Sequence, residues 1–568
     1  MKFFQRVVYT SLFPLLFALF CPTESHAWAR DGTPVAIGPQ SQVQPKVVGA
    51  DDGGAFVVWT DQGTHPGSGS DYVVLAQKLG PGGASEWEES GVRVGFTAGA
   101  QSLAQLASDD QGGVIVAWSQ FDASGSNAAV YAQRFTAKGQ RLWGDQGVRL
   151  APLEASTDFA LVGDGAGGAF TVGDTLVRDD SLSGYDRRLL LQHAGDRGQL
   201  LWPAGALRVS EGRGSQFEPK AVPDGHGGVI VAWIDGRDLF PGGFNADVYA
   251  QRFTGDGSRL WLSTGAPVCL NKAPQWSLAV IARPSGGIDL AWADTRKYPL
   301  FQYQVYAQAL DENGEPRWTQ DGVLVSPYGE QGAAALADDG ADGIIVAWNE
   351  FQAPSYAIHI FAQHLDASGS ALWQVGGITL SQPRGGSSIV SDGEGGAIVL
   401  LSGEQAVIQH VSGEGALLQS EVLSPSADGY GALTSTKNQF IAVWGDVRNG
   451  PDDIDVYAAR FKPSPSHVPP SLTIRESETP QTRTGDLSLT VSPNPASGRF
   501  TVSAATTGGL PARLSVFDIH GRLVMGRDLS AGAMSMTAGA RERLEPGIYL
   551  VVVEQGKTKA VQRICLLP

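Results

Sequence analysis

The stretch that decides the fold is PDGHGGVIVAWIDGRDLFPGGFNADVYAQRFTGDGSRLWLSTGAPV, residues 223–268. An Asp-Gly turn leads into an apolar run that ends at Trp233, and an Asp-x-Arg loop follows it. A second run, DVYAQRF, begins at Asp247, and a Gly-containing turn then leads to Trp261. Short apolar runs between Gly-rich turns predict β-strands joined by tight connections.

Variants of this unit recur along the whole chain. In two degenerate copies Gly173 and Leu401 stand where the other copies have an aromatic residue. In the other six copies the first apolar run ends at Trp59, Trp118, Trp233, Trp292, Trp348 and Trp444. Copies of four strands at a spacing of roughly 40–60 residues are typical of β-propeller blades. We therefore predict an all-β protein built on an eight-bladed β-propeller over residues 28–463.

The eighth copy lacks a fourth strand of its own. In other copies this strand carries a Trp followed four residues later by Gly, as at Trp261 and Gly265. After the eighth copy the chain enters a Pro-rich stretch, and Pro is excluded from central strands. Trp28 and Gly32 repeat the missing pattern near the start of the chain. We expect residues 28–38 to complete the last blade and to close the ring, which leaves no sheet edge beside a gap.

The start of the chain predicts export. Lys2 and Arg6 precede an apolar run that ends at Phe20, and small residues follow at Ser25 and Ala27. This order is typical of a secretory signal peptide, which we place at residues 1–27. No later segment is long and apolar enough to cross a bilayer, so we expect no transmembrane segment in the mature chain.

Composition narrows the classes of partner and cofactor. The 568 residues carry a formal net charge of −17, which argues against nucleic acid as a partner. The three cysteines, Cys21, Cys269 and Cys565, are too few and too far apart for a disulfide framework or a zinc cluster. We expect a monomer without a cofactor or a metal.

A different pattern begins after a Pro-, Ser- and Thr-rich linker at residues 464–486. Alternating strands over residues 487–568 predict a small immunoglobulin-like β-sandwich. This block resembles the C-terminal sorting domain of the type IX secretion system. The residues that carry the resemblance are Pro493, Asn494, Pro495, Gly498, Val516, Asp518, Gly521, Arg522, Gly547, Ile548 and Tyr549. The resemblance implies passage through the periplasm and recognition by the type IX secretion machinery. The product would then be secreted or held on the outer surface of a Gram-negative cell.

The repeats resemble two groups of propellers. The W-x-D-x-R and D-x-Y-A-Q elements are similar to those of secreted bacterial propellers. The hairpin at residues 365–373 resembles the tryptophan-docking repeat of eight-bladed quinoprotein dehydrogenases. The adjacent cysteine pair and the acidic calcium site of those dehydrogenases have no counterpart in this sequence, so the second likeness concerns architecture alone.

Recurring Asp-x-Arg loops between the second and third strands are the candidate ligand-binding residues. They are Asp235 with Arg237, Asp294 with Arg296, and Asp446 with Arg448. In a propeller these loops emerge on the face where ligands usually bind, and Arg can grip a carboxylate or sugar hydroxyls. The alternative is that each Arg pairs with the Asp of its own loop and fixes its shape. Recurrence in several blades favours this alternative, because a single site needs no repeated copies.

No catalytic residues are predicted. The histidines do not converge in the repeat pattern: His193, His364 and His410 stand where Arg134 and Arg252 stand in other copies. The sequence has no nucleophile elbow, HExxH motif or phosphate-binding Gly loop. The favoured hypothesis is therefore a propeller that binds an extracellular protein or glycan without catalysis. The alternatives are a polysaccharide hydrolase or lyase, and a quinoprotein-like oxidoreductase.

Overall fold

The computed structural model describes residues 28–463 and 488–567, apart from short gaps. The gaps are residues 30, 64–71, 89, 123–127, 155–157, 180–183, 203–204, 238–245, 297–302, 353–356, 382–385, 438, 493–495, 498–499, 506–511, 519–522, 530–532, 539–546 and 556–557. The expected signal peptide and linker lie outside the described residues. The chain divides into two compact units, Met1–His467 and Val468–Pro568.

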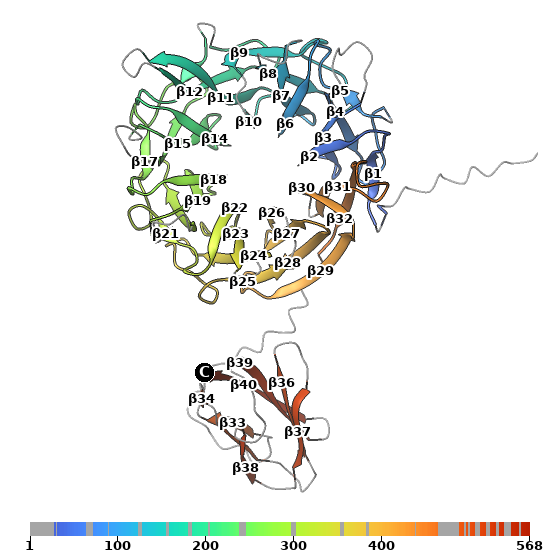
Figure 1. Ribbon diagram of the computed structural model, residues 1–568, viewed down its shortest axis with the longest axis vertical. Coiled ribbons are helices and arrows are strands. Elements are labelled where there is room, and N and C mark those ends of the chain that lie inside the picture. The colour runs from blue at the N-terminus through green and yellow to red at the C-terminus, as the bar shows by residue number, and fades with distance from the viewer. Residues whose placement is uncertain are drawn as a thin grey trace, which may run out of the picture. The chain divides into compact units, whose positions relative to one another are not determined.

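The first unit is a ring of eight four-stranded antiparallel sheets (Figure 1), so the all-β prediction is confirmed. From the centre outward, the first four sheets are β2 (Gln42–Gly49), β3 (Ala55–Asp61), β4 (Val73–Leu79) and β5 (Val92–Arg93); β6 (Gln101–Ser108), β7 (Val114–Phe121), β8 (Ala128–Phe135) and β9 (Val148–Glu154); β10 (Phe159–Gly163), β11 (Ala169–Asp179), β12 (Gly184–Ala194) and β13 (Leu207–Arg208); and β14 (Gln216–Pro223), β15 (Val229–Asp235), β16 (Asp247–Phe253) and β17 (Ala266–Cys269). We number these sheets blades 1 to 4.

Blades 5 to 8 continue the same order around the ring. They are β18 (Gln275–Ala282), β19 (Ile288–Asp294), β20 (Gln304–Leu310) and β21 (Val323–Leu324); β22 (Glu330–Asp338), β23 (Ile344–Gln352), β24 (Ala357–Leu365) and β25 (Ile378–Ser381); β26 (Gly386–Ser391), β27 (Ala397–Ser402), β28 (Ala406–Val411) and β29 (Leu417–Ser424); and β30 (Ala427–Thr436), β31 (Gln439–Asp446), β32 (Asp455–Phe461) and β1 (Thr33–Ala36).

Six of the eight blades are built around a tryptophan in the second strand, and Gly173 and Leu401 take this position in blades 3 and 7. Trp233 in β15 is fully buried, and the neighbouring Ala232 leaves space for the ring. The outer strand covers the indole with Gly265, on which a Cβ atom would lie only 2.5 Å from the ring. Gly265 also has a φ of +90°, a conformation that side chains disfavour. The Trp-to-Gly spacing of the fourth strand therefore reflects a contact with a different tryptophan, the one in the second strand.

In every blade except blade 7, a tryptophan five residues before the fourth strand joins the blade to the next one. The Trp261 indole N–H donates to the carbonyl oxygen of Glu312 at 3.0 Å, in the turn between the third and fourth strands of blade 5. The ring lies over Gly314, where a Cβ atom would come within 2.7 Å of it. The same ring-on-glycine contact occurs for Trp28 on Gly83, Trp87 on Gly139, Trp143 on Gly198, Trp202 on Gly257, Trp318 on Gly369, and Trp373 on Gly415.

A buried ion pair strengthens the same joint. Arg252 donates from Nε to Asp224 of its own blade at 3.0 Å and from Nη1 to the Glu312 carbonyl at 3.0 Å. His364 lies in the same way between Asp339 and the carbonyl of Gly413, both at 2.9 Å. From the sequence alone, the hairpin aspartates are assigned only to turns. In the structure they also hold the Arg or His side chain that reaches the neighbouring blade.

Blade 5 keeps the ion pair with its partners exchanged. Arg283 occupies the hairpin position of Asp224, and Ala309 takes the position of Arg252. The carboxylate now comes from the second strand, where Asp289 accepts from Arg283, and both side chains are fully buried. Burial raises the pKa of Asp289 to about 7 against the opposing effect of Arg283. Blade 5 thus keeps a buried Arg–Asp pair near its hairpin, because an unpaired buried charge is costly.

The N-terminal strand closes the ring. β1 pairs antiparallel with β32, with Thr33 opposite Ala458. The Gly38 amide donates to the Asp455 carboxylate at 3.2 Å, and the Trp28 indole N–H donates to the Pro81 carbonyl at 3.0 Å. Residues next to the expected cleavage site thus contact both blade 8 and blade 1.

The second unit contains two sheets. The first consists of β33 (Ser488–Ser492), β35 (Phe500–Ala505) and β38 (Ala533–Ala538). The second consists of β34 (Ala496–Ser497), β40 (Thr558–Leu567), β39 (Gly547–Gln555), β36 (Ala512–Asp518) and β37 (Leu523–Leu529). The immunoglobulin-like classification stays a prediction. Over the described part of the chain, no helix has the length and apolar character to span a membrane.

Deleting residues 28–38 should open the ring, because β32 loses its partner and blade 1 loses the Trp28 contact. We expect a lower melting temperature and soluble aggregates, measured by calorimetry and light scattering. Deletion of residues 464–568 is the matched control and should leave the main transition in place. A monomeric 28–38 deletion variant with the original melting temperature would refute the closure.

The hairpin carboxylates should make the stability of the ring depend on pH in the acid range. Burial raises the pKa of Asp339, but hydrogen bonds from His364 and the amides of Ala341 and Gly343 outweigh it and lower the pKa. This contribution to stability is complete above the unfolded-state pKa of about 3.9 and is lost as pH falls through the folded-state value. Asp339→Asn should cost about 2 kcal/mol near pH 7 in urea unfolding.

The difference between Asp339→Asn and the wild type should shrink steadily below about pH 4. Asp51→Asn, at an exposed carboxylate, serves as the control and should change stability little at any pH. A penalty for Asp339→Asn that stays constant down to pH 3 would contradict the ion-pair role.

Candidate functional site

The topology places the candidate loops on one face of the ring. In an antiparallel blade the turns between strands one and two and between strands three and four lie at one end. The loops between strands two and three lie at the opposite end, together with the connection to the next blade. The Asp-x-Arg loops share this face, which we call the loop face, with the connections at residues 37–41 and 94–100.

Within each loop the structure brings Asp and Arg together. Arg237 donates from Nε and Nη2 to the two oxygens of Asp235, at 2.7 and 2.8 Å. Its guanidinium carbon lies 3.7 Å from the centroid of the Tyr249 ring, and Nη2 also donates to the Thr264 carbonyl at 2.9 Å. The Arg237 side chain is therefore held by its own blade on three sides.

The other two loops repeat these contacts. Arg448 donates to both oxygens of Asp446, at 2.9 and 2.7 Å, and to the Asp31 carbonyl at 2.8 Å. Burial raises the pKa of Asp446, but hydrogen bonds from Arg448, Ser424 and Trp444 outweigh it and lower the pKa. These contacts match the alternative interpretation, in which each Arg pairs with the Asp of its own loop and fixes the shape of that loop. The three pairs belong to three separate blades, so ligand binding by these residues stays a prediction.

In blade 5 the arginine also contacts a buried thiol. Arg296 donates to Asp294 at 2.5 Å and to the Cys269 sulfur at 3.1 Å. Burial raises the pKa of the Cys269 thiol to about 12, against the opposing effect of Arg296. A buried neutral thiol is chemically inert, so Cys269 is a packing residue.

The aspartate has a second role that the sequence analysis missed. The indole N–H of Trp233 donates to Asp235 at 2.7 Å, and that of Trp444 donates to Asp446 at 2.9 Å. In blade 2, where the aspartate is absent, Gln120 accepts the bond from Trp118 at 3.3 Å. The signal was available in the constant two-residue spacing from the tryptophan to a side chain that can accept a hydrogen bond.

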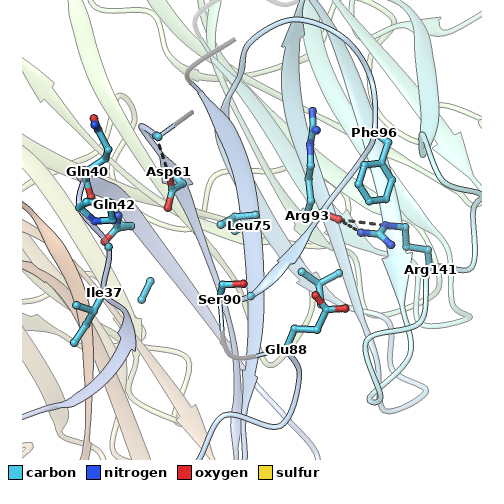
Figure 2. Close-up of a pocket in the computed structure, with 16 residues that line it drawn as sticks. Ile37, Gln40, Gln42, Asp61, Leu75, Glu88, Ser90, Arg93, Phe96 and Arg141 are labelled. Carbon is cyan, nitrogen blue, oxygen red and sulfur yellow. Dashed lines mark hydrogen bonds between the residues drawn. The ribbon is translucent and has the colours of Figure 1, made fainter. Parts of the chain in front are cut away.

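A pocket of about 560 Å³ lies at blade 1 (Figure 2), and residues from both ends of the sheet line it, such as Gln40 on the loop face and Glu88 in the connection between β4 and β5. Its walls come from the connection out of β1, the end of β3, the outer strand β5 and the first residues toward blade 2. The polar groups that line it include Asp61, Glu88, Ser90, Arg93 and Arg141. Pockets of this size with a few polar groups are typical of small-ligand sites.

One aromatic ring and two guanidinium groups dominate one wall of the pocket. Phe96 is 52% exposed. The guanidinium carbons of Arg93 and Arg141 lie 5.5 and 4.5 Å from the centroid of its ring. Figure 2 shows Arg141 extending from blade 2 to the Arg93 carbonyl, to which Nε donates at 3.1 Å.

The two arginines form a like-charge pair. Burial lowers the pKa of Arg93, and the neighbouring Arg141 lowers it further. Burial also lowers the pKa of Arg141 against the opposing effects of Asp145 and Glu88. Among the described residues, neither guanidinium has a carboxylate within 4.0 Å. Sequence reasoning did not identify this wall, because its residues come from two blades and from non-repeating connections.

The described residues include no group of three His, Cys, Asp or Glu side chains that could hold a metal ion. Of the residues that carry the resemblance to the sorting domain, those outside the described residues are Pro493, Asn494, Pro495, Gly498, Gly521 and Arg522. Asp518 and Tyr549 lie opposite each other on β36 and β39, and Gly547 begins β39. The Tyr549 side chain is buried in this sheet.

Comparison with known proteins identifies the second unit. A family model described as the secretion system C-terminal sorting domain matches residues 490–566. The chain thus carries a type IX sorting domain, which directs it to the cell surface or the extracellular space. No curated protein matches the chain.

Several solved structures are similar to the chain at low identity. The polysaccharide lyase Uly1 is 10% identical with a TM-score of 0.42, over 76% of this chain and 100% of that chain. An α-L-arabinanase of Penicillium chrysogenum, complexed with arabinobiose, is 14% identical with a TM-score of 0.34, over 54% and 92%. The acylaminoacyl peptidase of Pyrococcus horikoshii is 11% identical with a TM-score of 0.38, over 73% and 59%. At these scores the similarities carry no functional argument.

Removing Arg237 tests the loop pairs. Arg237→Ala leaves the fully buried Asp235 carboxylate without its main partner, so we expect a loss of about 3 kcal/mol in urea unfolding. Arg317→Ala, at an exposed arginine, should change stability little. Unchanged stability of Arg237→Ala would contradict the loop-fixing role and leave ligand binding as the reason for the arginine.

Proposed function

We propose that the propeller is an extracellular binding module that recognises a glycan in the blade 1 pocket, after export through the type IX secretion system. The observation that carries the proposal is the exposed Phe96 ring on the wall of a pocket that also contains carboxylate, hydroxyl and guanidinium groups. An aromatic face buries the apolar side of a sugar ring, and polar groups around it bind the hydroxyls.

The neighbouring residues support this reading. Glu88 and Ser90 provide hydrogen-bond acceptors for sugar hydroxyls, and Ile37, which is also exposed, adds an apolar surface across the pocket. The rigid sheets of blades 1 and 2 hold these groups in place. A binding module needs this fixed arrangement, because immobilising side chains on binding costs free energy.

The test is a glycan array with the purified residue 28–463 protein, followed by calorimetry on the best ligand. We expect Phe96→Ala to weaken binding at least about tenfold, since it removes the stacking surface. Tyr328→Ala removes an exposed aromatic residue of another blade and is the matched control.

Chromatography of the incubated glycan distinguishes binding from catalysis. Binding with unchanged glycan supports the proposal. Shortened or unsaturated products would instead support the polysaccharide hydrolase or lyase. Absence of binding across the array, or equal loss in both variants, would contradict the blade 1 pocket as a glycan site.

A further inference from the structure

We infer that the blade 1 pocket selects acidic glycans, and that Arg93 and Arg141 hold a carboxylate or sulfate group while the sugar ring lies against Phe96. This inference rests on the proposed function and specifies its ligand. Its main support is an equivalent place elsewhere in the ring. There the backbone contacts are the same, and a carboxylate of the chain itself pairs with the arginine.

The matched site lies between blades 3 and 4. Arg259 of blade 4 extends to the carbonyl oxygen of Arg208 in blade 3, as Arg141 extends to that of Arg93. The backbone beyond the outer strand also follows the same path. The Phe96 amide donates to the Asp145 carbonyl at 3.0 Å, and the Glu211 amide donates to the Ser263 carbonyl at 3.0 Å.

Phe96 and Glu211 therefore occupy equivalent positions, but one side chain is apolar and the other carries a carboxylate. At blades 3 and 4 the Glu211 carboxylate lies 2.9 Å from Nη2 of Arg259, so the chain supplies its own anion. At blades 1 and 2 Phe96 replaces that carboxylate, and both guanidiniums border an open pocket. An external anion restores at the first site the charge balance that Glu211 provides at the second.

The geometry favours an acidic sugar over a free anion or an acidic peptide. The Arg93 and Arg141 guanidiniums both lie beside one exposed ring, so a ligand that carries its charge on a flat, partly apolar ring can use all three groups. Guanidinium groups bind carboxylate and sulfate oxygens through charge-assisted hydrogen bonds. The ring of Phe96 supplies the stacking surface that inorganic ions do not need.

The decisive experiment exchanges the two residues. The probes are a trigalacturonate and the corresponding neutral galactose trisaccharide, titrated by calorimetry in low and high salt. We expect the wild type to bind the acidic trisaccharide at least about tenfold more tightly, and the preference to fall with salt because the charges are screened. Phe96→Glu should abolish this preference, since it places a carboxylate beside Arg93 and Arg141.

Phe96→Gln is the matched neutral control and should keep a preference for the acidic probe at lower total affinity. Glu211→Phe should create a second acidic-glycan site and raise the measured stoichiometry from one to two. A melting curve for each variant shows that the ring remains folded, so loss of binding cannot be attributed to unfolding.

The outcomes separate this inference from the proposed function. Equal binding of acidic and neutral trisaccharides overturns the charge selection and leaves glycan binding in place. Failure of both trisaccharides, together with a negative glycan array, overturns both. Sulfate or an acidic peptide binding as tightly as trigalacturonate, with no effect of Phe96→Gln, would show an anion site without sugar recognition.

Discussion

The structure depends on the contact between a tryptophan just before the outer strand of one blade and a glycine of the following blade. Each ring lies against backbone where a Cβ atom would clash, and in most copies its indole N–H bonds to a carbonyl in the same turn. In blades 2 and 4 a buried arginine donates to that same turn, and in blade 6 His364 contacts it, and each of these side chains is held in place by an aspartate of its own hairpin. Apolar packing, a hydrogen bond and an ion pair therefore act together at single joints, which leaves little freedom for one sheet to rotate against the next.

The paired charged side chains of this ring stabilise its packing. The Asp-x-Arg loops, the hairpin aspartates and the exchanged pair in blade 5 all satisfy groups that burial would otherwise leave unpaired. This use of charge makes the exception informative. Beside Phe96, two arginines border a pocket and have no carboxylate within 4.0 Å among the described residues, and departures of this kind from local rules concentrate at functional sites.

The repeat pattern predicted the second and third strands well, because both faces of these strands are buried and their sequences are nearly continuous apolar runs. The fourth strands were harder to place. β5, β13 and β21 contain two residues each, too few for a periodic signal. The Trp-to-Gly spacing was visible, but its cause was not, since the glycine covers a distant tryptophan of the second strand, as Gly265 covers Trp233. The pocket could not be predicted because it combines one blade's outer strand with the next blade's hairpin.

Closure of the ring also determines when the first strand can pair during folding. Gly38 and Asp455 are 417 positions apart, so β1 must wait for almost the entire propeller before it finds its partner. Contacts of such long range form late in folding. During synthesis the segment with Val35 and Ala36, both buried in the closed ring, remains exposed to water and to other chains. Until blade 8 has formed, this segment lacks its partner strand β32 and remains open to pairing with other chains.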